Sequence, residues 1–284
     1  MLDAQAMNGS RHDAQTCPAA SHVGGHGSTL VLLHGLTGSW EIRRPVLPLL
    51  ERHHRVVAVT LPGHHGGPAF RGPGDATLAA IADQLADMLR AQGIDRAHIV
   101  GNSLGGWLSI EVARRGFARS VVALSPAGGW RTPGDYLAVA RPFRLAYSTV
   151  DGVRFALRPF FRFERTRRAL LGQIMEHGER VPASVLESML AAMSNTVVLP
   201  GLLRTFGRDG PVQPLRIAGT PIRIAWAERD RVIPFERYGR PFVERIDGAE
   251  LVRMPGVGHV PMYDDPALVA ETILAVTRRV DGSP

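Results

Sequence analysis

The sequence predicts an α/β protein with a mostly parallel, doubly wound sheet and an inserted helical cap. Three observations predict this class. The chain has 284 residues, of which 45% are hydrophobic, which is enough for one large core. Short apolar runs alternate with segments of helical periodicity, a pattern typical of parallel sheets with helices on both faces. The alternation stops between about residues 131 and 214, where only helical periodicity continues, and then resumes.

Four apolar runs in the first half of the chain predict strands that are covered on both faces. They span residues 29–34, 55–60, 97–100 and 120–125. Helices are predicted between them, over residues 41–51, 77–92 and 104–115. The second of these helices is the clearest, because Thr77 can cap it and Gly93 can end it. Pro45 and Pro48 interrupt the first.

The remaining core elements are predicted after residue 214. Strands are expected over residues 221–227 and 249–254, and helices over residues 234–245 and 266–279. The core then comprises residues 29–130 and 215–284. Residues 131–214 would form a helical cap over the carboxyl ends of the strands, where open α/β sheets bind ligands. Residues 1–28 are rich in small and polar residues and are expected to be a disordered lead.

The clearest helix of the cap is predicted over residues 184–194. Its apolar side would comprise Val185, Leu186, Met189 and Met193. The phenylalanines and methionines of the cap could form an apolar acyl or aromatic pocket, or could only attach the cap to the core, and the sequence leaves both open. The basic stretch from Arg162 to Arg168 is either a solvated helix face or a surface that attracts an anionic substrate or membrane.

Composition and charge exclude several classes of function. The formal net charge is +7, and the 33 basic residues are all arginines spread along the chain, so nucleic-acid binding is not expected. Cys17 is the only cysteine, which excludes an intrachain disulfide and a cysteine metal cluster. The sequence contains no apolar run of about 18 residues, so no membrane span is expected. An apolar signal core is also missing, and we expect a cytoplasmic location. The oligomeric state stays unassigned.

Two pairs of polar residues are interpreted without a metal ion or cofactor. His64 and His65 are adjacent in a glycine-rich loop, but no carboxylate stands at metal-ligand spacing beside them. We expect such neighbouring histidines at the surface, where they could line a site. Asp264 and Asp265 precede Pro266 and are expected to begin the last helix.

A short motif follows the third predicted strand. Residues 101–105, Gly-Asn-Ser-Leu-Gly, match the G-x-S-x-G pattern of a nucleophile elbow. A serine hydroxyl is a weak nucleophile unless it is presented at a strand end close to a base. Gly101, Gly105 and Gly106 would give room for the sharp turn that presents Ser103. The alternative is an ordinary strand–turn–helix with a capping serine.

Three residues of the types found in an acyl-transfer triad each follow a predicted strand. Ser103 follows the third strand, Asp230 the fifth and His259 the sixth. The carboxyl ends of parallel strands meet at one edge of a sheet, so their separation in the sequence is no obstacle. The order Ser, Asp, His is also the one expected for this architecture. Glu228 ends the same strand as Asp230 and stays open as the alternative acid.

These motifs resemble the α/β-hydrolase fold family over essentially the whole chain from Thr29 onward. The resemblance includes His34-Gly35 after the first strand, the Gly-Asn-Ser-Leu-Gly-Gly elbow, Asp230 with Pro234 four residues later, and Gly258-His259. Two features depart from the family pattern. Thr60 stands where the loop after the second strand usually carries an aspartate, and the N-terminal strand pair is hard to find in residues 1–28. We therefore expect six strands rather than eight.

The triad assigns a role to each side chain. His259 would accept the proton of Ser103 and later protonate the leaving group, and Asp230 would orient the imidazole and stabilise its charged form. The oxyanion of the tetrahedral intermediate needs two donors. The backbone N–H of Leu104 is expected to be one, and the resemblance implies the backbone N–H of Leu36 as the other.

Serine at the elbow separates related chemistries. Dehalogenases and epoxide hydrolases that resemble this pattern carry aspartate as nucleophile, so Ser103 argues against both. We expect a serine hydrolase that cleaves a carboxylic ester of a small to medium, partly apolar substrate. Hydrolysis of a carbon–carbon, lactone or thioester bond by the same triad is the alternative, and a non-catalytic ligand-binding protein is a third. His34 is expected only to position the oxyanion loop.

Overall fold

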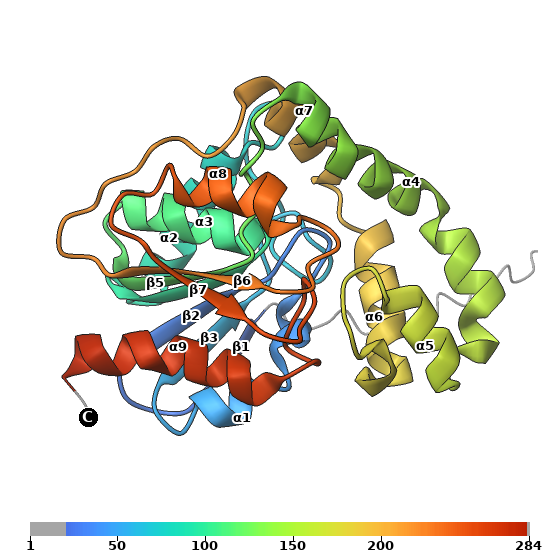
Figure 1. Cartoon of the computed structure of the whole chain (residues 1–284), viewed down its shortest axis with the longest axis horizontal. Coiled ribbons are helices and arrows are strands. Elements are labelled where there is room, and N and C mark those ends of the chain that lie inside the picture. Colours follow the sequence, from blue (N-terminus) through green and yellow to red (C-terminus); the bar gives the residue numbers. More distant parts are fainter. Residues whose placement is uncertain (1–20, 283–284) are drawn as a thin grey trace, which may run out of the picture.

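A computed structural model describes residues 21–282, so the disorder predicted for residues 1–20 lies outside the described residues. Within the described part, seven strands form one sheet in the order β1-β3-β2-β4-β5-β6-β7 (Figure 1). β1 is antiparallel to β3, and the other neighbouring strands are parallel. The strands are β1 (Ser21–Gly24), β2 (Thr29–Leu33), β3 (Arg55–Val59), β4 (Ala97–Asn102), β5 (Ala118–Leu124), β6 (Ile222–Ala227) and β7 (Glu250–Met254).

β1 corrects two predictions. The sheet has seven strands among the described residues rather than six, and residues 21–24 form an edge strand rather than part of a disordered lead. Four residues are too few for a hydrophobic alternation to show, and Val23 is 51% exposed. The strand is held by backbone pairing with β3 and by a 2.6 Å contact between His22 Nε2 and Glu51 Oε1.

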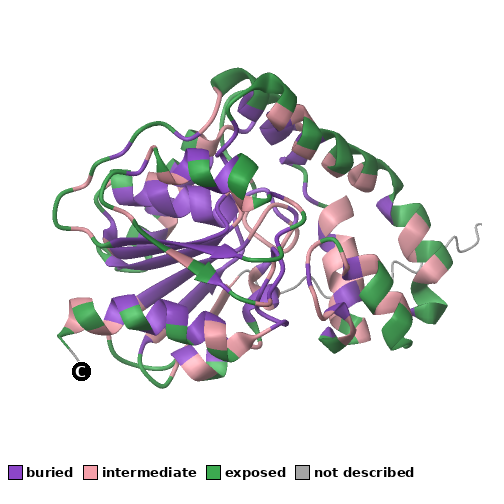
Figure 2. Cartoon of the chain, viewed as in Figure 1, coloured by how far each residue is buried: buried purple, intermediate pink, exposed green. Residues whose placement is uncertain are grey.

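Helices cover both faces of the sheet (Figure 1). One face carries α2 (Leu78–Ala91), α3 (Leu104–Arg114) and α8 (Arg240–Val243), and the other carries α1 (Leu47–Leu50) and α9 (Pro266–Asp281). Buried residues concentrate in the strands and on the helix faces that meet them (Figure 2). This arrangement confirms the doubly wound α/β prediction.

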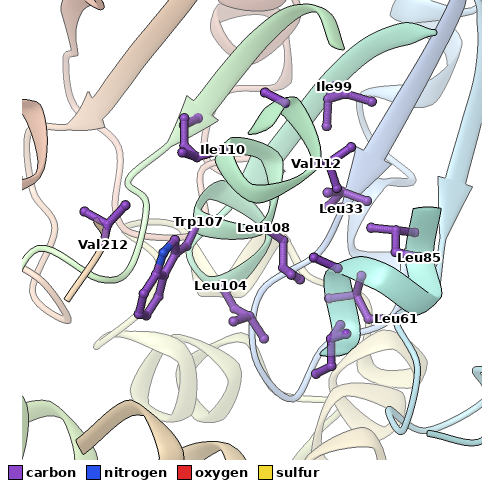
Figure 3. Packing of buried hydrophobic residues seen from close by; sticks show 14 of the residues in the cluster. Leu33, Leu61, Leu85, Ile99, Leu104, Trp107, Leu108, Ile110, Val112 and Val212 are labelled. Atoms are coloured by element: carbon purple, nitrogen blue, oxygen red, sulfur yellow. The ribbon is translucent and has the colours of Figure 1, made fainter. Parts of the chain in front are cut away.

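Alternate residues of each central strand enter two hydrophobic clusters. In β2, Val31 and Leu33 belong to the cluster under α2 and α3, whereas Leu30 and Leu32 belong to the cluster under α1 and α9. Figure 3 shows the first cluster, in which Leu108 of α3 lies among side chains of α2 and the central strands. The continuous apolar runs in the sequence therefore reflect burial on both faces.

Two predicted helices are each divided into two shorter elements. The segment expected over residues 41–51 forms a 3₁₀ turn, η1 (Trp40–Arg43), and the short helix α1. The segment expected over residues 234–245 forms a π-helical turn, η4 (Phe235–Gly239), followed by α8. Pro45 lies between η1 and α1, and Pro241 stands in the first turn of α8, a position where the missing N–H of proline costs no helical hydrogen bond.

The segment between β5 and β6 is helical, and its described residues form no strand. It contains α4 (Pro133–Leu157), η2 (Arg158–Phe160), α5 (Glu164–Leu171), η3 (Gly178–Arg180), α6 (Ala183–Ser194) and α7 (Leu199–Asp209). α6 confirms the helix predicted over residues 184–194. In Figure 1, α5 and α6 lie beyond the carboxyl ends of the strands. The exact boundary between core and cap stays a prediction.

No single helix in the described part of the chain is long and apolar enough to cross a bilayer. Among the described helices, α6 (Ala183–Ser194) and α7 (Leu199–Asp209) are together long and apolar enough, but this pair is bent by 64°.

Candidate active site

Ser103 occupies a strained turn between β4 and α3. Its backbone has φ +56° and ψ −117°, a conformation that non-glycine residues rarely adopt. Hydrogen bonds on both sides hold this conformation: Ser103 N donates to Leu124 O at 3.0 Å, and Ser103 O accepts from Ala127 N at 3.0 Å and Trp107 N at 3.1 Å. The turn thus presents Ser103 between a central strand and the helix that follows it.

The glycines around Ser103 are required by close backbone approach. A Cβ on Gly101 would lie 1.9 Å from Gly105 O, and a Cβ on Gly105 would lie 2.4 Å from Leu33 O. A Cβ on Gly106 would meet Pro126 Cβ at 2.9 Å. These distances are shorter than any ordinary carbon contact, so the prediction that the three glycines give room for the turn is confirmed.

The structure brings His259 and Asp230 together. His259 Nδ1 lies 2.7 Å from Asp230 Oδ2, and both residues are buried. The other carboxylate oxygen, Oδ1, accepts hydrogen bonds from Val232 N at 3.0 Å and Ile233 N at 2.8 Å. The carboxylate is therefore fixed from one side by the backbone and faces the imidazole with the other.

Glu228, the alternative acid, points elsewhere. It is exposed, and its Oε2 accepts a hydrogen bond from Gly256 N at 2.9 Å. It therefore supports the turn after β7, while the imidazole of His259 is paired with Asp230. The geometry thus favours Asp230 for the acid position.

Ser103 and His259 line the same pocket, which has a volume of about 280 Å³. Leu36 also lines it, in the loop that follows β2. A Cβ on Gly35 would lie 3.2 Å from Ser103 Cβ, so this loop passes directly beside the serine. The opposite wall comes from the segment between β5 and β6, including Phe143, Leu170, Ile174, Val185, Met189 and Met193. The pocket therefore lies between the strand ends and this helical segment.

The two backbone N–H groups predicted to bind the oxyanion lie in the segments beside Ser103. Leu104 is the first residue of α3, where N–H groups have no partner inside the helix. Leu36 lies in a turn in which Gly38 N donates to Gly35 O at 3.1 Å. The structure places both predicted oxyanion donors in the segments that flank the serine.

His34 supports the loop that contains Leu36. Its Nε2 accepts a hydrogen bond from Leu61 N at 2.9 Å, and its Nδ1 lies 2.7 Å from Gly35 O, to which it donates. Burial, with a contribution from the neighbouring His64, holds the pKa of His34 well below its ordinary value. The neutral ring thus bridges two loops, as expected for a positioning role.

The prediction that His64 lies at the surface is wrong. His64 is 3% exposed, and its ring meets that of His34 edge-on at 5.0 Å. The loop turns inward at Gly63, which has φ +72° and donates from N to Pro68 O at 2.8 Å. Burial lowers the pKa of His64 to about 4, so the ring is neutral near pH 7. It belongs to the support of the loop and not to the lining of the pocket.

Sequence reasoning missed two residues that hold His259. Asn102 Nδ2 donates to His259 O at 2.9 Å and to Leu124 O at 3.1 Å. Asp264 was expected to begin the last helix, but Asp265 caps that helix by accepting from Leu268 N at 2.9 Å. Asp264 is instead buried and accepts from the backbone of the histidine loop. The only sequence feature that pointed to either residue was the position of Asn102 inside the elbow motif, next to Ser103.

One group in the described part of the chain could hold a metal ion: His54, His98 and Asp281, whose ligating atoms lie within 4.8 Å of one another. Hydrogen bonds already occupy these atoms, because His98 contacts Ser120 Oγ at 2.7 Å and Asp281 Oδ1 at 3.1 Å. His54 contacts Thr277 Oγ1 at 2.8 Å. The group lies near the amino end of β4, whereas Ser103 follows its carboxyl end.

Comparison with known proteins places the chain in a family. The model of the alpha/beta hydrolase family matches residues 30–272. The chain is 34% identical over 213 residues to the epoxide hydrolase EphH of Mycobacterium tuberculosis, covering 69% of this chain and 92% of that protein. It is 28% identical over 264 residues to a putative carbamate hydrolase, RutD, of Variovorax paradoxus, covering 91% and 95%.

Solved structures agree on the fold. A thermophilic esterase from Thermogutta terrifontis matches with a TM-score of 0.70 and 19% identity over 92% of this chain and 93% of that one. An enol-lactonase from Burkholderia xenovorans matches with a TM-score of 0.66 and 16% identity over 90% and 94%. With the match to the family model and the identity to EphH, the comparisons lead to one conclusion. The chain belongs to the alpha/beta hydrolase family and is a hydrolase.

Proposed function

We propose that this hydrolase cleaves a carboxylic ester of a small to medium, partly apolar substrate through an acyl-enzyme formed on Ser103. One observation carries the proposal. Ser103, presented by a strained turn, and His259, paired with Asp230 at 2.7 Å, line the same pocket. The observation supports the proposal because an imidazole oriented by a carboxylate is the base that activates a serine hydroxyl for attack on an acyl carbon.

The pairing with Asp230 assigns the proton transfers. Because Nδ1 of His259 donates to the carboxylate, Nε2 is left as the basic nitrogen. It takes the proton as Ser103 Oγ attacks the acyl carbon, and it returns this proton to the leaving alcohol. Water then attacks the acyl-enzyme with the same base, which releases the acid and restores Ser103.

The negative charge of each tetrahedral intermediate would be received by the N–H groups of Leu36 and Leu104. Gly35 leaves room for the oxyanion loop beside Ser103, because a Cβ at this position would lie 3.2 Å from Ser103 Cβ. Loss of one such donor typically costs about 3–4 kcal/mol in the transition state.

The pocket lining supports an apolar acyl or alcohol group. Its wall is built mainly from aliphatic, aromatic and methionine side chains, and the volume of about 280 Å³ suits a small to medium group. A polar exception is Glu41, whose Oε2 accepts a hydrogen bond from Ser188 Oγ at 2.7 Å. Carbamate and lactone hydrolysis, the activities named for RutD and the enol-lactonase, use the same acyl transfer and remain alternatives.

Epoxide hydrolysis, the activity named for EphH, fits this chain less well. Attack of a carboxylate on an epoxide gives an ester, which water can cleave at its carbonyl. Attack of Ser103 Oγ would give an ether, which has no carbonyl for water to attack. A serine at the elbow therefore favours acyl substrates.

The proposal is tested with initial rates on p-nitrophenyl esters from acetate to decanoate, an aryl carbamate, an enol lactone and styrene oxide. Wild type is expected to hydrolyse esters, and the rate of Ser103→Ala should be at least about 10³-fold lower. Ser148→Ala, on exposed α4, is the matched control and should keep it. Opening of styrene oxide without ester turnover would contradict the proposal.

A further inference from the structure

The backbone around His259 is held from three directions. Asn102 Nδ2 donates to His259 O at 2.9 Å from the core. On either side of the histidine, Gly258 N donates to Asp264 Oδ2 at 2.8 Å and Val260 N donates to Ile174 O at 2.8 Å. The last of these contacts comes from the helical segment between β5 and β6.

Asp264 joins that segment to the histidine loop. Its carboxylate is 2% exposed and accepts hydrogen bonds from three backbone groups. Besides Gly258 N, these are Glu176 N at 3.0 Å to Oδ2 and His177 N at 2.7 Å to Oδ1. Packing is tight here, because a Cβ on Gly258 would meet Ile174 O and Met175 Cα at 3.0 Å. One buried carboxylate thus fixes two loops together.

The same helical segment also contacts the loop that contains Asp230. Glu176 Oε2 accepts from Arg229 Nη1 at 3.0 Å, and its Oε1 lies 2.6 Å from Arg231 Nη1 as an ion pair outside hydrogen-bond geometry. Arg231 Nη1 also donates to Gly172 O at 2.9 Å. Arg229 and Arg231 flank Asp230, so both neighbours of the candidate acid are tied to one side chain.

We propose that residues 174–177 and Asp264 form a positioning junction that sets the orientation of His259 against Asp230. The inference rests on the proposed function, since it assigns these residues to the support of its base and acid. Asp264 and residues 175–177 act through the two loops and are not among the residues that line the pocket, whereas Ile174 also contributes to its wall. The junction also anchors the helical segment at residues 174–177 to the histidine loop.

The test compares Asp264→Asn with Asp265→Asn in the full-length protein. The two substitutions remove the same charge at neighbouring positions, but only the Asp264 carboxylate accepts a hydrogen bond from the histidine loop, whereas the Asp265 carboxylate accepts from Leu268 N. Asp264→Asn should lower kcat for p-nitrophenyl acetate roughly 10- to 100-fold, because a misplacement of about 1 Å can cost about 100-fold. KM should stay within about threefold, and Asp265→Asn should leave both parameters unchanged. A thermal unfolding curve of each variant checks that the variant is folded at the assay temperature.

A second readout does not depend on turnover. The hydrogen-bonded Nδ1 proton of His259 should give a downfield proton NMR resonance, identified by its loss in His259→Ala. Asp264→Asn should shift or broaden this resonance, Asp265→Asn should preserve it, and Glu176→Gln should act in the same direction as Asp264→Asn. Unchanged resonance and kcat in Asp264→Asn would overturn the junction while leaving the proposed function intact. Wild type without ester turnover would overturn the proposed function, and the resonance would still decide the junction.

Discussion

Asp230 and His259 are 29 positions apart in the sequence, yet Asp230 Oδ2 and His259 Nδ1 lie 2.7 Å apart. They meet because the parallel strands β6 and β7 are neighbours and end at the same edge of the sheet. Backbone N–H groups hold the second carboxylate oxygen, so the carboxylate cannot turn away from the imidazole. Proton transfer by His259 should therefore depend strongly on this carboxylate.

Asp230→Asn is expected to lower kcat by about 10⁴-fold, because the amide cannot stabilise the charged imidazole or hold the correct tautomer. Steady-state rates on p-nitrophenyl acetate measure the loss. Glu228→Gln is the control and should change kcat by less than about threefold, since this carboxylate supports Gly256 N. A larger loss in Glu228→Gln than in Asp230→Asn would assign the acid role to Glu228.

Gly101→Ala should destabilise the fold. The added Cβ would lie 1.9 Å from Gly105 O, so strand and helix would have to separate, and we expect a loss of about 3 kcal/mol or more in the free energy of unfolding. Urea unfolding measures it. Gly152→Ala in α4 has no atom within 4 Å of the new Cβ and should instead gain roughly 0.5–1 kcal/mol. Equal free energies of unfolding for the two variants would contradict the claim that the turn around Ser103 has no room for a side chain at position 101.

Stability should fall as the pH falls from 6.5 to 4. Burial lowers the pKa of His64 from 6.5 to about 4, so the unfolded chain binds this proton first as the pH falls. The free energy of unfolding is unaffected by protonation of His64 above pH 6.5. Between pH 6.5 and pH 4 the preferential protonation of the unfolded chain lowers it by roughly 3 kcal/mol. Urea unfolding at several pH values should show a shallower slope for His64→Gln. The exposed His26→Gln is its control, and an unchanged slope in His64→Gln would contradict the prediction.

Met193→Trp should shorten the acyl chains that the enzyme accepts. Met193 lines the pocket from α6, and an indole there would occupy space needed by a long chain. We expect kcat/KM to fall at least roughly tenfold for p-nitrophenyl octanoate and by less than threefold for the acetate. Leu145→Trp, on the exposed side of α4, is the control. Equal losses for both esters would show that the long chain binds elsewhere.

The central strands could be predicted from the sequence because their signals are local. Runs such as residues 29–34 are apolar throughout, since both of their faces are buried. Ser103, Asp230 and His259 could be predicted to meet because each lies in the segment that follows a predicted strand, β4, β6 and β7 respectively. β1 could not be found, because its four residues pair through the backbone and leave no apolar pattern.

The supporting residues were harder to predict because their partners are far away in the sequence. Asp264 is 87 residues from His177, to which it is hydrogen-bonded, and it stands beside Asp265, whose capping role is typical of a helix start. His64 is in a loop rich in glycine, which usually indicates exposure, yet the loop packs its ring on His34. Such contacts depend on the folded arrangement of loops rather than on local pattern.

The most direct measurement of the proposed function is the intact mass of the protein after exposure to a serine-reactive fluorophosphonate. Wild type should gain the mass of one adduct, because Ser103 lines the pocket together with His259 and the proposed function makes His259 its base. Ser103→Ala should gain none, and His259→Ala should react far more slowly. An adduct of equal yield on Ser103→Ala, or none on wild type, would contradict the assignment of Ser103 as the nucleophile.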